Sequence, residues 1–266
     1  MRTLRLIGTT LLMVLCAVNF TACSDDEDEN NDTNNGINPQ KVFVNGMPKQ
    51  VSDMKITQDA SGLVSKIETD DAVAIFKYPT AVTTRAELSN QLVIVELTED
   101  IGTQYEEKFI FNMEIGDNGF IKHCDEKYED GELDTWDFTY STEGYMLSMK
   151  RSEGGNETTT ITYKDGDIIK TSTVSADEPE VSSIYTIDYT SNTVTTPIEN
   201  KGCLMFYDET LGIDMDEMWF AYYAGLLGKA TKHLPLKLTY ESEFNPYEDI
   251  TNFTWTLNAN GLPTLL

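Results

Sequence analysis

The sequence predicts an all-β fold, an antiparallel meander that forms a curved sheet or an open β-barrel. Short apolar stretches are separated repeatedly by turns that contain Gly, where Asp, Asn and Ser bond to the backbone and Gly takes a positive φ. Between these turns, apolar and polar residues alternate as in strands that bury one face. One stripe of apolar residues at helical spacing predicts a short helix packed on or across the sheet.

The chain opens with the features of a lipoprotein signal. Two arginines precede an apolar run over 6–20, and small residues stand immediately before Cys23. A basic start, a run too short to cross a bilayer and a small-residue cleavage point predict a signal peptide over 1–22. The Cys that follows resembles the bacterial lipobox, in which this Cys is lipidated and becomes the first mature residue. We therefore expect Cys23 to anchor the chain to a membrane.

Residues 23–38 are expected to form the lipidated Cys and a disordered acidic tether. The segment is rich in acids and Asn and has no aromatic residue, so it has too little apolar surface to offset the entropy of ordering. The acids that begin at Asp25 resemble the export signal of Bacteroidota lipoproteins. That resemblance implies an outer-membrane protein exposed at the cell surface, with a periplasm-facing position as the alternative.

The composition argues against two classes of partner and leaves the pairing of two Cys open. The formal net charge of −26 argues against nucleic acid and anionic headgroups as partners, because both are bound through Lys and Arg. Of the four Cys, Cys124 and Cys203 lie outside the signal peptide and the anchor. They form either a disulfide, as an oxidising envelope allows, or two separate buried thiols.

The strands are predicted in a single domain over 39–266. The turn unit, with an apolar strand end, a short polar stretch, a Gly and a new apolar strand, occurs at 56–64, 113–121, 138–146, 161–168 and 255–263. Alternation between buried and exposed positions is clearest over 136–140, 185–189 and 253–257. These patterns predict hairpins that follow one another along the chain.

The helix is predicted as an insert near 214–227. Its stripe contains Met215, Met218, Trp219, Tyr222, Tyr223 and Leu226. Acidic residues at its start suit the helix dipole, and Gly225 and Gly228 weaken and end it. We expect this amphipathic helix to lie between strands and to pack against the sheet.

Together these segments resemble a known family. The lipobox, the acidic tether, the Gly-turn meander, the apolar segment 222–235 and a closing strand that ends at 260–264 are similar to Bacteroidota lipoproteins of unknown function. Those lipoproteins are described as porin-like, or as similar in fold to periplasmic lipoprotein carriers. The resemblance implies a curved, open antiparallel barrel closed partly by the helix, and it brings no established catalytic residue.

Nothing in the sequence predicts an enzyme, a metal site or a cofactor. His123 adjoins Cys124, but neighbouring strand residues point to opposite faces, and His233 has no ligand-like neighbour at helical spacing. With 45 acids, some pair meets the spacing of a glycosidase by chance, and no Asp-rich calcium loop is present. An enzyme would need a cleft that holds a carboxylate of strongly raised pKa beside a second acid.

The aromatic residues suggest a binding role instead. We expect Trp219, Tyr222 and Tyr223 to face a ligand at the mouth of the barrel, with a cavity beneath the helix. The predicted function is a membrane-anchored, non-catalytic binding module for an apolar or amphipathic ligand, such as a lipid, a glycan or a peptide. The alternative is a structural or adhesive envelope component that presents its surface to an unknown protein partner.

Overall fold

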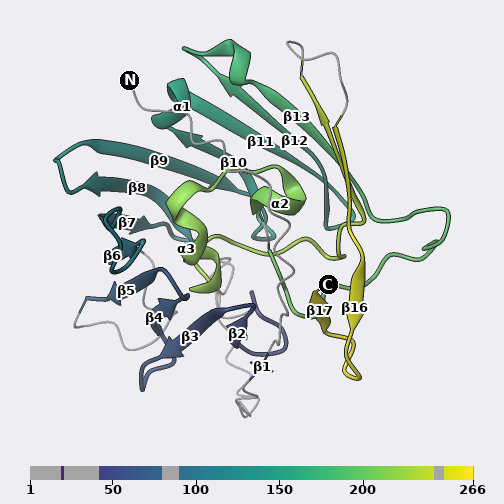
Figure 1. The fold of residues 1–266 in the computed structure, drawn as a ribbon, viewed down its shortest axis with the longest axis horizontal. Coiled ribbons are helices and arrows are strands. Elements are labelled where there is room, and N and C mark those ends of the chain that lie inside the picture. The colour runs from purple at the N-terminus through teal and green to yellow at the C-terminus, as the bar shows by residue number, and fades with distance from the viewer. Residues whose placement is uncertain (1–18, 21–41, 80–89, 206, 243–248, 266) are drawn as a thin grey trace.

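A computed structural model describes residues 19–20, 42–79, 90–205, 207–242 and 249–265 (Figure 1). Cys23 and the segment predicted as an acidic tether lie outside these described residues. So does the predicted signal peptide, apart from β1 (Asn19–Phe20), which pairs with β2. No helix in the described ranges is both long enough and apolar enough to span a membrane.

The predicted all-β meander is confirmed. One antiparallel sheet runs in sequence order from β1 to β15, and its two end strands do not pair with each other. After β1 its strands are β2 (Pro48–Val51), β3 (Met54–Gln58), β4 (Val64–Glu68), β5 (Val73–Lys77), β6 (Leu92–Glu99), β7 (Glu107–Ile115), β8 (Ile121–Tyr128), β9 (Leu133–Tyr140), β10 (Met146–Arg151), β11 (Glu157–Lys164), β12 (Asp167–Ser175), β13 (Ser183–Asp188), β14 (Lys237–Glu241) and β15 (Asp249–Asn252). A separate hairpin joins β16 (Trp255–Leu257) to β17 (Pro263–Leu265).

The turns form as their chemistry predicts. In the turn between β3 and β4, the Asp59 carboxylate accepts hydrogen bonds from the backbone N–H of Ser61 and Leu63 at 2.9 and 3.1 Å. Gly62 there has a φ of +79°, a conformation that costs Gly little and other residues more. The Gly residues of the other predicted turns are likewise at positive φ, namely Gly119, Gly144, Gly166 and Gly261.

The predicted helix is shorter than expected and lies inside the sheet. Besides α1 (Glu153–Asn156) and η3 (Pro179–Val181), the helical elements are α2 (Tyr207–Leu211), η4 (Asp216–Met218) and α3 (Trp219–Tyr223). Figure 1 shows the sheet curving around α2 and α3, which both come from the chain between β13 and β14. The helical insert predicted near 214–227 is therefore present, but as the short elements η4 and α3 rather than as one longer helix. It ends before Gly225, as predicted, where φ is +77°.

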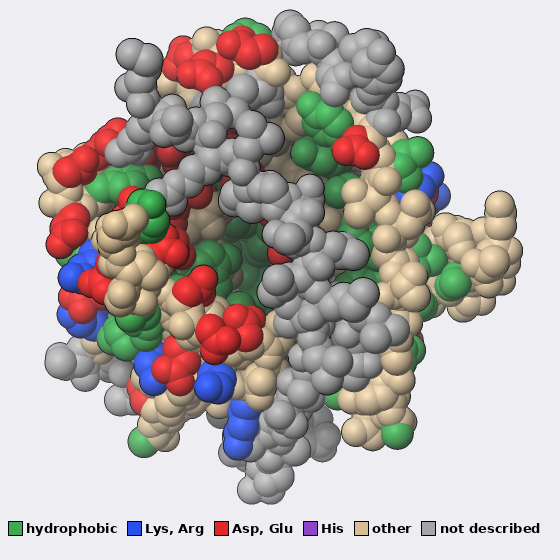
Figure 2. Space-filling view, in the orientation of Figure 1, with side chains coloured by type: hydrophobic (Ala, Val, Ile, Leu, Met, Phe, Trp, Pro, Cys, Tyr) green, Lys and Arg blue, Asp and Glu red, His purple; other side chains and the backbone are tan. Residues whose placement is uncertain are grey.

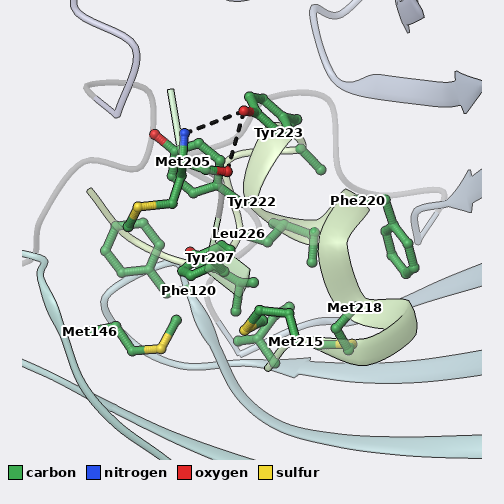
Figure 3. Close-up of a cluster of buried hydrophobic side chains, with 14 of the residues drawn as sticks. Phe120, Met146, Met205, Tyr207, Met215, Met218, Phe220, Tyr222, Tyr223 and Leu226 are labelled. Carbon is green, nitrogen blue, oxygen red and sulfur yellow. Dashed lines mark hydrogen bonds between the residues drawn. The ribbon is translucent and has the colours of Figure 1, made fainter. Parts of the chain in front are cut away.

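The helical segment fills the concave side of the sheet. Phe220 is fully buried, with its ring edge-on to Phe76 and Phe111 at centroid distances of 5.7 and 5.2 Å. Met218 and Tyr222 are equally buried (Figure 3). Each such side chain contributes roughly 1.5–3 kcal/mol through burial. Because the sheet surrounds it, α3 is buried on nearly every side rather than amphipathic.

The outward face of the sheet is polar. On β11 it presents Thr158, Thr160 and Thr162, and charged Lys108 and Lys150 point outward from β7 and β10. The inward positions of the same strands are buried and mainly apolar. The core is therefore made by one face of the sheet and the helical segment that it encloses.

Candidate functional site

The aromatic residues predicted to face a ligand belong mainly to the core. Tyr222 is 0% exposed and Tyr223 is 3% exposed, and the Tyr222 hydroxyl donates a hydrogen bond to the Cys203 carbonyl at 2.5 Å. Both rings contact Phe43, and Figure 3 shows the two tyrosines within the buried cluster. Their prediction as ligand-facing residues is wrong because the sheet curves around α3, so the face expected to line a cavity packs into the core instead.

Trp219 is placed differently from the two tyrosines. It is half-buried, and its indole N–H donates a hydrogen bond to Glu99 Oε1 at 3.1 Å. That bond ties the start of α3 to the end of β6. Trp219 thus serves to fix the helix against the sheet.

The two cysteines are free thiols. Cys124 is buried on the inward face of β8, and Cys203 is half-buried in the loop before α2. The possible disulfide is not formed, and the alternative of two separate thiols describes the structure. Burial raises the pKa of both thiols, which makes them poor nucleophiles. His123 points away from Cys124 and pairs with Asp137 at 2.7 Å.

A groove of about 500 Å³ opens where α2 meets the last strands of the sheet. Two aromatic rings and four carboxylates line it: Tyr185, Tyr240, Glu157, Asp208, Asp214 and Asp249. Its floor comes from the inward positions of β11 to β15, and α2 with the loop after it forms the facing wall. Strand periodicity places these floor residues on one face.

Strand register aligns the centre of the groove. Tyr185 on β13 pairs with Tyr240 on β14, which pairs in turn with Asp249 on β15. The two tyrosine rings are 5.2 Å apart between centroids and inclined by 48°. Gly212, with a φ of +61°, brings the loop after α2 onto Tyr185, and a Cβ there would lie 2.3 Å from the ring. A Gly at this position is therefore required for the groove to keep its shape.

Arg151 organises the acidic wall of the groove. Its side chain is 8% exposed, its Nε donates to Glu157 at 2.9 Å, and a terminal nitrogen donates to Asp214 at 2.7 Å. A second terminal nitrogen lies 3.6 Å from Asp216. One cation thus serves three carboxylates and links β10 and β11 to the loop that follows α2.

Asp208, unlike the three carboxylates that Arg151 contacts, forms no ion pair within the described part of the chain. It lies in the first turn of α2. Burial raises the pKa of its carboxyl to about 6, and the nearby charges of Asp214 and Glu209 add to the increase. The groove therefore carries more negative charge than its own cation neutralises.

A second group of acids lies behind Arg151, within the fold. Glu126 is 0% exposed, and one of its oxygens accepts a hydrogen bond from the Trp136 indole at 2.7 Å, whereas the other has no partner among the described residues. Burial is the main cause that raises the pKa of Glu126, Glu153, Asp216 and Glu217 to about 7. The negative charges of neighbouring carboxylates in the group raise these pKa values further.

These acids do not converge as metal ligands do. Within the described part of the chain, no group of three or more His, Cys, Asp or Glu is arranged to hold a metal ion. Partial burial and mutual repulsion favour the protonated forms of these carboxyls, which accounts for their raised pKa values.

The chain is similar to known proteins in sequence and in fold. A family model described as a domain of unknown function (DUF4595) with porin-like fold matches residues 51–265. The chain belongs to this family. A crystal structure of a porin-like protein from Bacteroides uniformis is similar, with a TM-score of 0.51, 17% identity and 79% of each chain covered. At that identity the likeness concerns the fold alone, and the comparison with curated proteins gave no match.

For this DUF4595 domain, the resemblance drawn from the sequence is confirmed as to the porin-like fold and the unknown function of the family. The groove was missed. Tyr185 was recognised as part of an alternating strand, but its partner Tyr240 lies 55 residues further along the chain, which follows from their numbers. Only the pairing of β13 with β14 brings them together.

Proposed function

We propose that this DUF4595 domain is a membrane-anchored, non-catalytic binding module of the bacterial envelope, and that the groove between α2 and β11–β15 holds its ligand. The supporting observation is the paired Tyr185 and Tyr240 beside carboxylates in a space of about 500 Å³. This volume suits a small-molecule site, where apolar walls and a few polar groups act together.

An amphipathic ligand fits the lining best. The tyrosine rings and Leu238 offer apolar surface, and Asp208 and Asp249 accept hydrogen bonds at its border. A ligand enclosed within the curved sheet is less suitable, because side chains such as Phe120, Tyr207 and Met215 already fill that space (Figure 3).

The lipid on Cys23 would hold this module at the outer membrane. Surface exposure follows from the acidic residues after Cys23, and a periplasm-facing position is the alternative. The mature chain needs no cofactor in this role, and its tether would let the groove reach ligands near the membrane.

Native mass spectrometry of the mature lipoprotein, purified gently from its own envelope, tests the proposal. We expect a small amphipathic adduct on the wild type, and its loss in Tyr240→Ala, which removes part of the floor of the groove. Tyr105→Ala is the matched control, since Tyr105 is 59% exposed and lies in the loop between β6 and β7. A clean apo mass for the wild type, even after incubation with envelope lipids, glycans and peptides, would refute the proposal.

Catalysis is a second candidate, favoured by one observation. Asp208 has a pKa raised to about 6 and lies near Asp214 in the groove, as a general acid beside a second carboxylate would. Hydrolysis of envelope glycans by the wild type, lost in Asp208→Asn while binding is retained, would support catalysis over binding alone.

Surface presentation is a third candidate. The filled interior and the exposed edge strand β15 favour it, because an unpaired strand edge can accept a strand from another protein. A protein partner lost in Ile250→Pro, with the groove adduct unchanged, would support this role.

A further inference from the structure

We propose that the groove recognises an organic cation, an alkylammonium or guanidinium group carried on the ligand. This inference rests on the proposed function, because it takes the groove as the place where the ligand binds. Three features support it: the charge of the lining, the position of Arg151 and the paired tyrosine rings.

The charged residues of the lining are all acidic. Glu157, Asp208, Asp214 and Asp249 supply carboxylates from both sides of the groove, and no Lys, Arg or His among the described residues lines it. Figure 2 shows acidic side chains along the upper edge and the left of the face drawn, with basic ones beside them on the left and lower left. A ligand that carries phosphate or carboxylate would meet repulsion from every side, whereas a cation would be attracted.

Arg151 accounts for part of this charge only. It pairs with Glu157 and Asp214 and reaches toward Asp216, so its positive charge is shared among groups on one wall. Asp249, on the opposite side, stands on the outermost strand of the sheet and is not among the carboxylates that Arg151 contacts. A ligand cation between Asp249 and Asp208 would supply the missing charge.

Besides the carboxylates, the paired tyrosine rings supply aromatic faces to which a cation can bind. An ammonium or guanidinium group is attracted to the face of an aromatic ring within about 6 Å of its centroid. Tyr240 is the direct cross-strand neighbour of Asp249, and such neighbours have Cβ atoms about 5 Å apart. A cation over the Tyr240 ring is thus also within reach of the Asp249 carboxylate.

The state of Asp208 agrees with this assignment. Partial burial and the negative charges of Asp214 and Glu209 raise the pKa of its carboxyl to about 6, although the charge of Arg151 acts in the opposite direction. A bound cation would stabilise the ionised form and lower that pKa. Binding would therefore release a proton near pH 6 and weaken below it.

Isothermal titration of the mature lipoprotein with matched probes tests the inference. The probes are the capped tripeptides Ala-Lys-Ala and Ala-Gln-Ala, which differ in charge, and spermidine. We expect the Lys peptide to bind about tenfold more tightly than the Gln peptide, and to weaken severalfold in Asp249→Asn and in Asp208→Asn. Glu143→Gln is the control for net charge, since Glu143 is exposed in the turn between β9 and β10.

The outcomes separate the two proposals. Equal affinity for the Lys and Gln peptides, or an equal loss in Glu143→Gln and Asp249→Asn, would overturn cation recognition. The groove function would survive that result if the envelope adduct still depended on Tyr240. Tighter binding of spermidine than of the Lys peptide would assign a free polyamine as the source of the cation, and the reverse order would assign a peptide.

Discussion

Replacing Glu126 by Gln is expected to stabilise the folded domain at pH 8. The side chain is 0% exposed, and one of its oxygens has no partner in the described chain. Gln has nearly the same shape, and its amide oxygen can still accept the hydrogen bond from the Trp136 indole. Its amide N–H also adds a donor close to Asp216 and Glu153, whose charges act on Glu126.

The size of the expected gain in stability follows from the pKa of Glu126. Burial raises the pKa of Glu126 from 4.5 to about 7, and this difference corresponds to roughly 3 kcal/mol of lost stability once the pH is well above 7. Because the pKa of the folded state is raised, the stability is fully present below the unfolded pKa near 4.5 and is lost as the pH rises through about 7. Glu126→Gln should therefore gain up to about 3 kcal/mol at pH 8 and close to nothing at pH 4.5.

Urea unfolding followed by Trp fluorescence at these two pH values measures the effect, with Glu143→Gln as an exposed control expected to change little at either. A loss of stability in Glu126→Gln of the same size at both pH values would refute the reasoning. That result would mean that the ionised carboxylate makes a favourable contact which the amide cannot replace.

Three further changes are expected to lower the free energy of unfolding measured in urea. Gly212→Ala should cost at least about 1 kcal/mol for its positive φ alone, and it should also abolish groove binding because its Cβ displaces Tyr185; unchanged binding would contradict the close approach. Phe220→Ala should cost about 3–5 kcal/mol through the cavity left in the core, and a cost below 1 kcal/mol would show that the interior is loosely packed. Arg151→Met should cost about 3–5 kcal/mol near pH 7 by leaving the buried Glu157 unpaired, and a much smaller cost at pH 4 would distinguish this charge effect from lost packing.

The strands and turns could be predicted because their causes are local. Asp59 and Gly62 act within a few residues of each other, and the alternation of Trp136 with Phe138 reports one buried face. The signal is weaker near the end of the chain, where Leu257 is 42% exposed despite the predicted alternation. There the hairpin of β16 and β17 stands apart from the main sheet, so its apolar residues have less to pack against.

The interior and the groove could not be predicted in the same way. The spacing of Met218 and Tyr222 correctly indicated helical structure, but whether such a stripe faces a cavity or a filled core depends on how the sheet curves. The groove depends on register between β13 and β14, which are separated by the helical segment. Acidic residues are so frequent in the chain that those which meet in the groove could not be distinguished from the rest.

The long insert between β13 and β14 has a consequence for the order in which the chain folds. Most neighbouring strands of the sheet are joined by short turns, so their pairing closes small loops at low entropic cost. β14 meets β13 only across residues 189–236, which include the helical segment that packs inside the sheet. The groove should therefore be the last part of the domain to fold. Pulsed hydrogen exchange should detect protection of the backbone amides in β7–β9 before those in β13 and β14. The earlier strands would therefore be paired before the helical segment and β14 complete both the core and the groove.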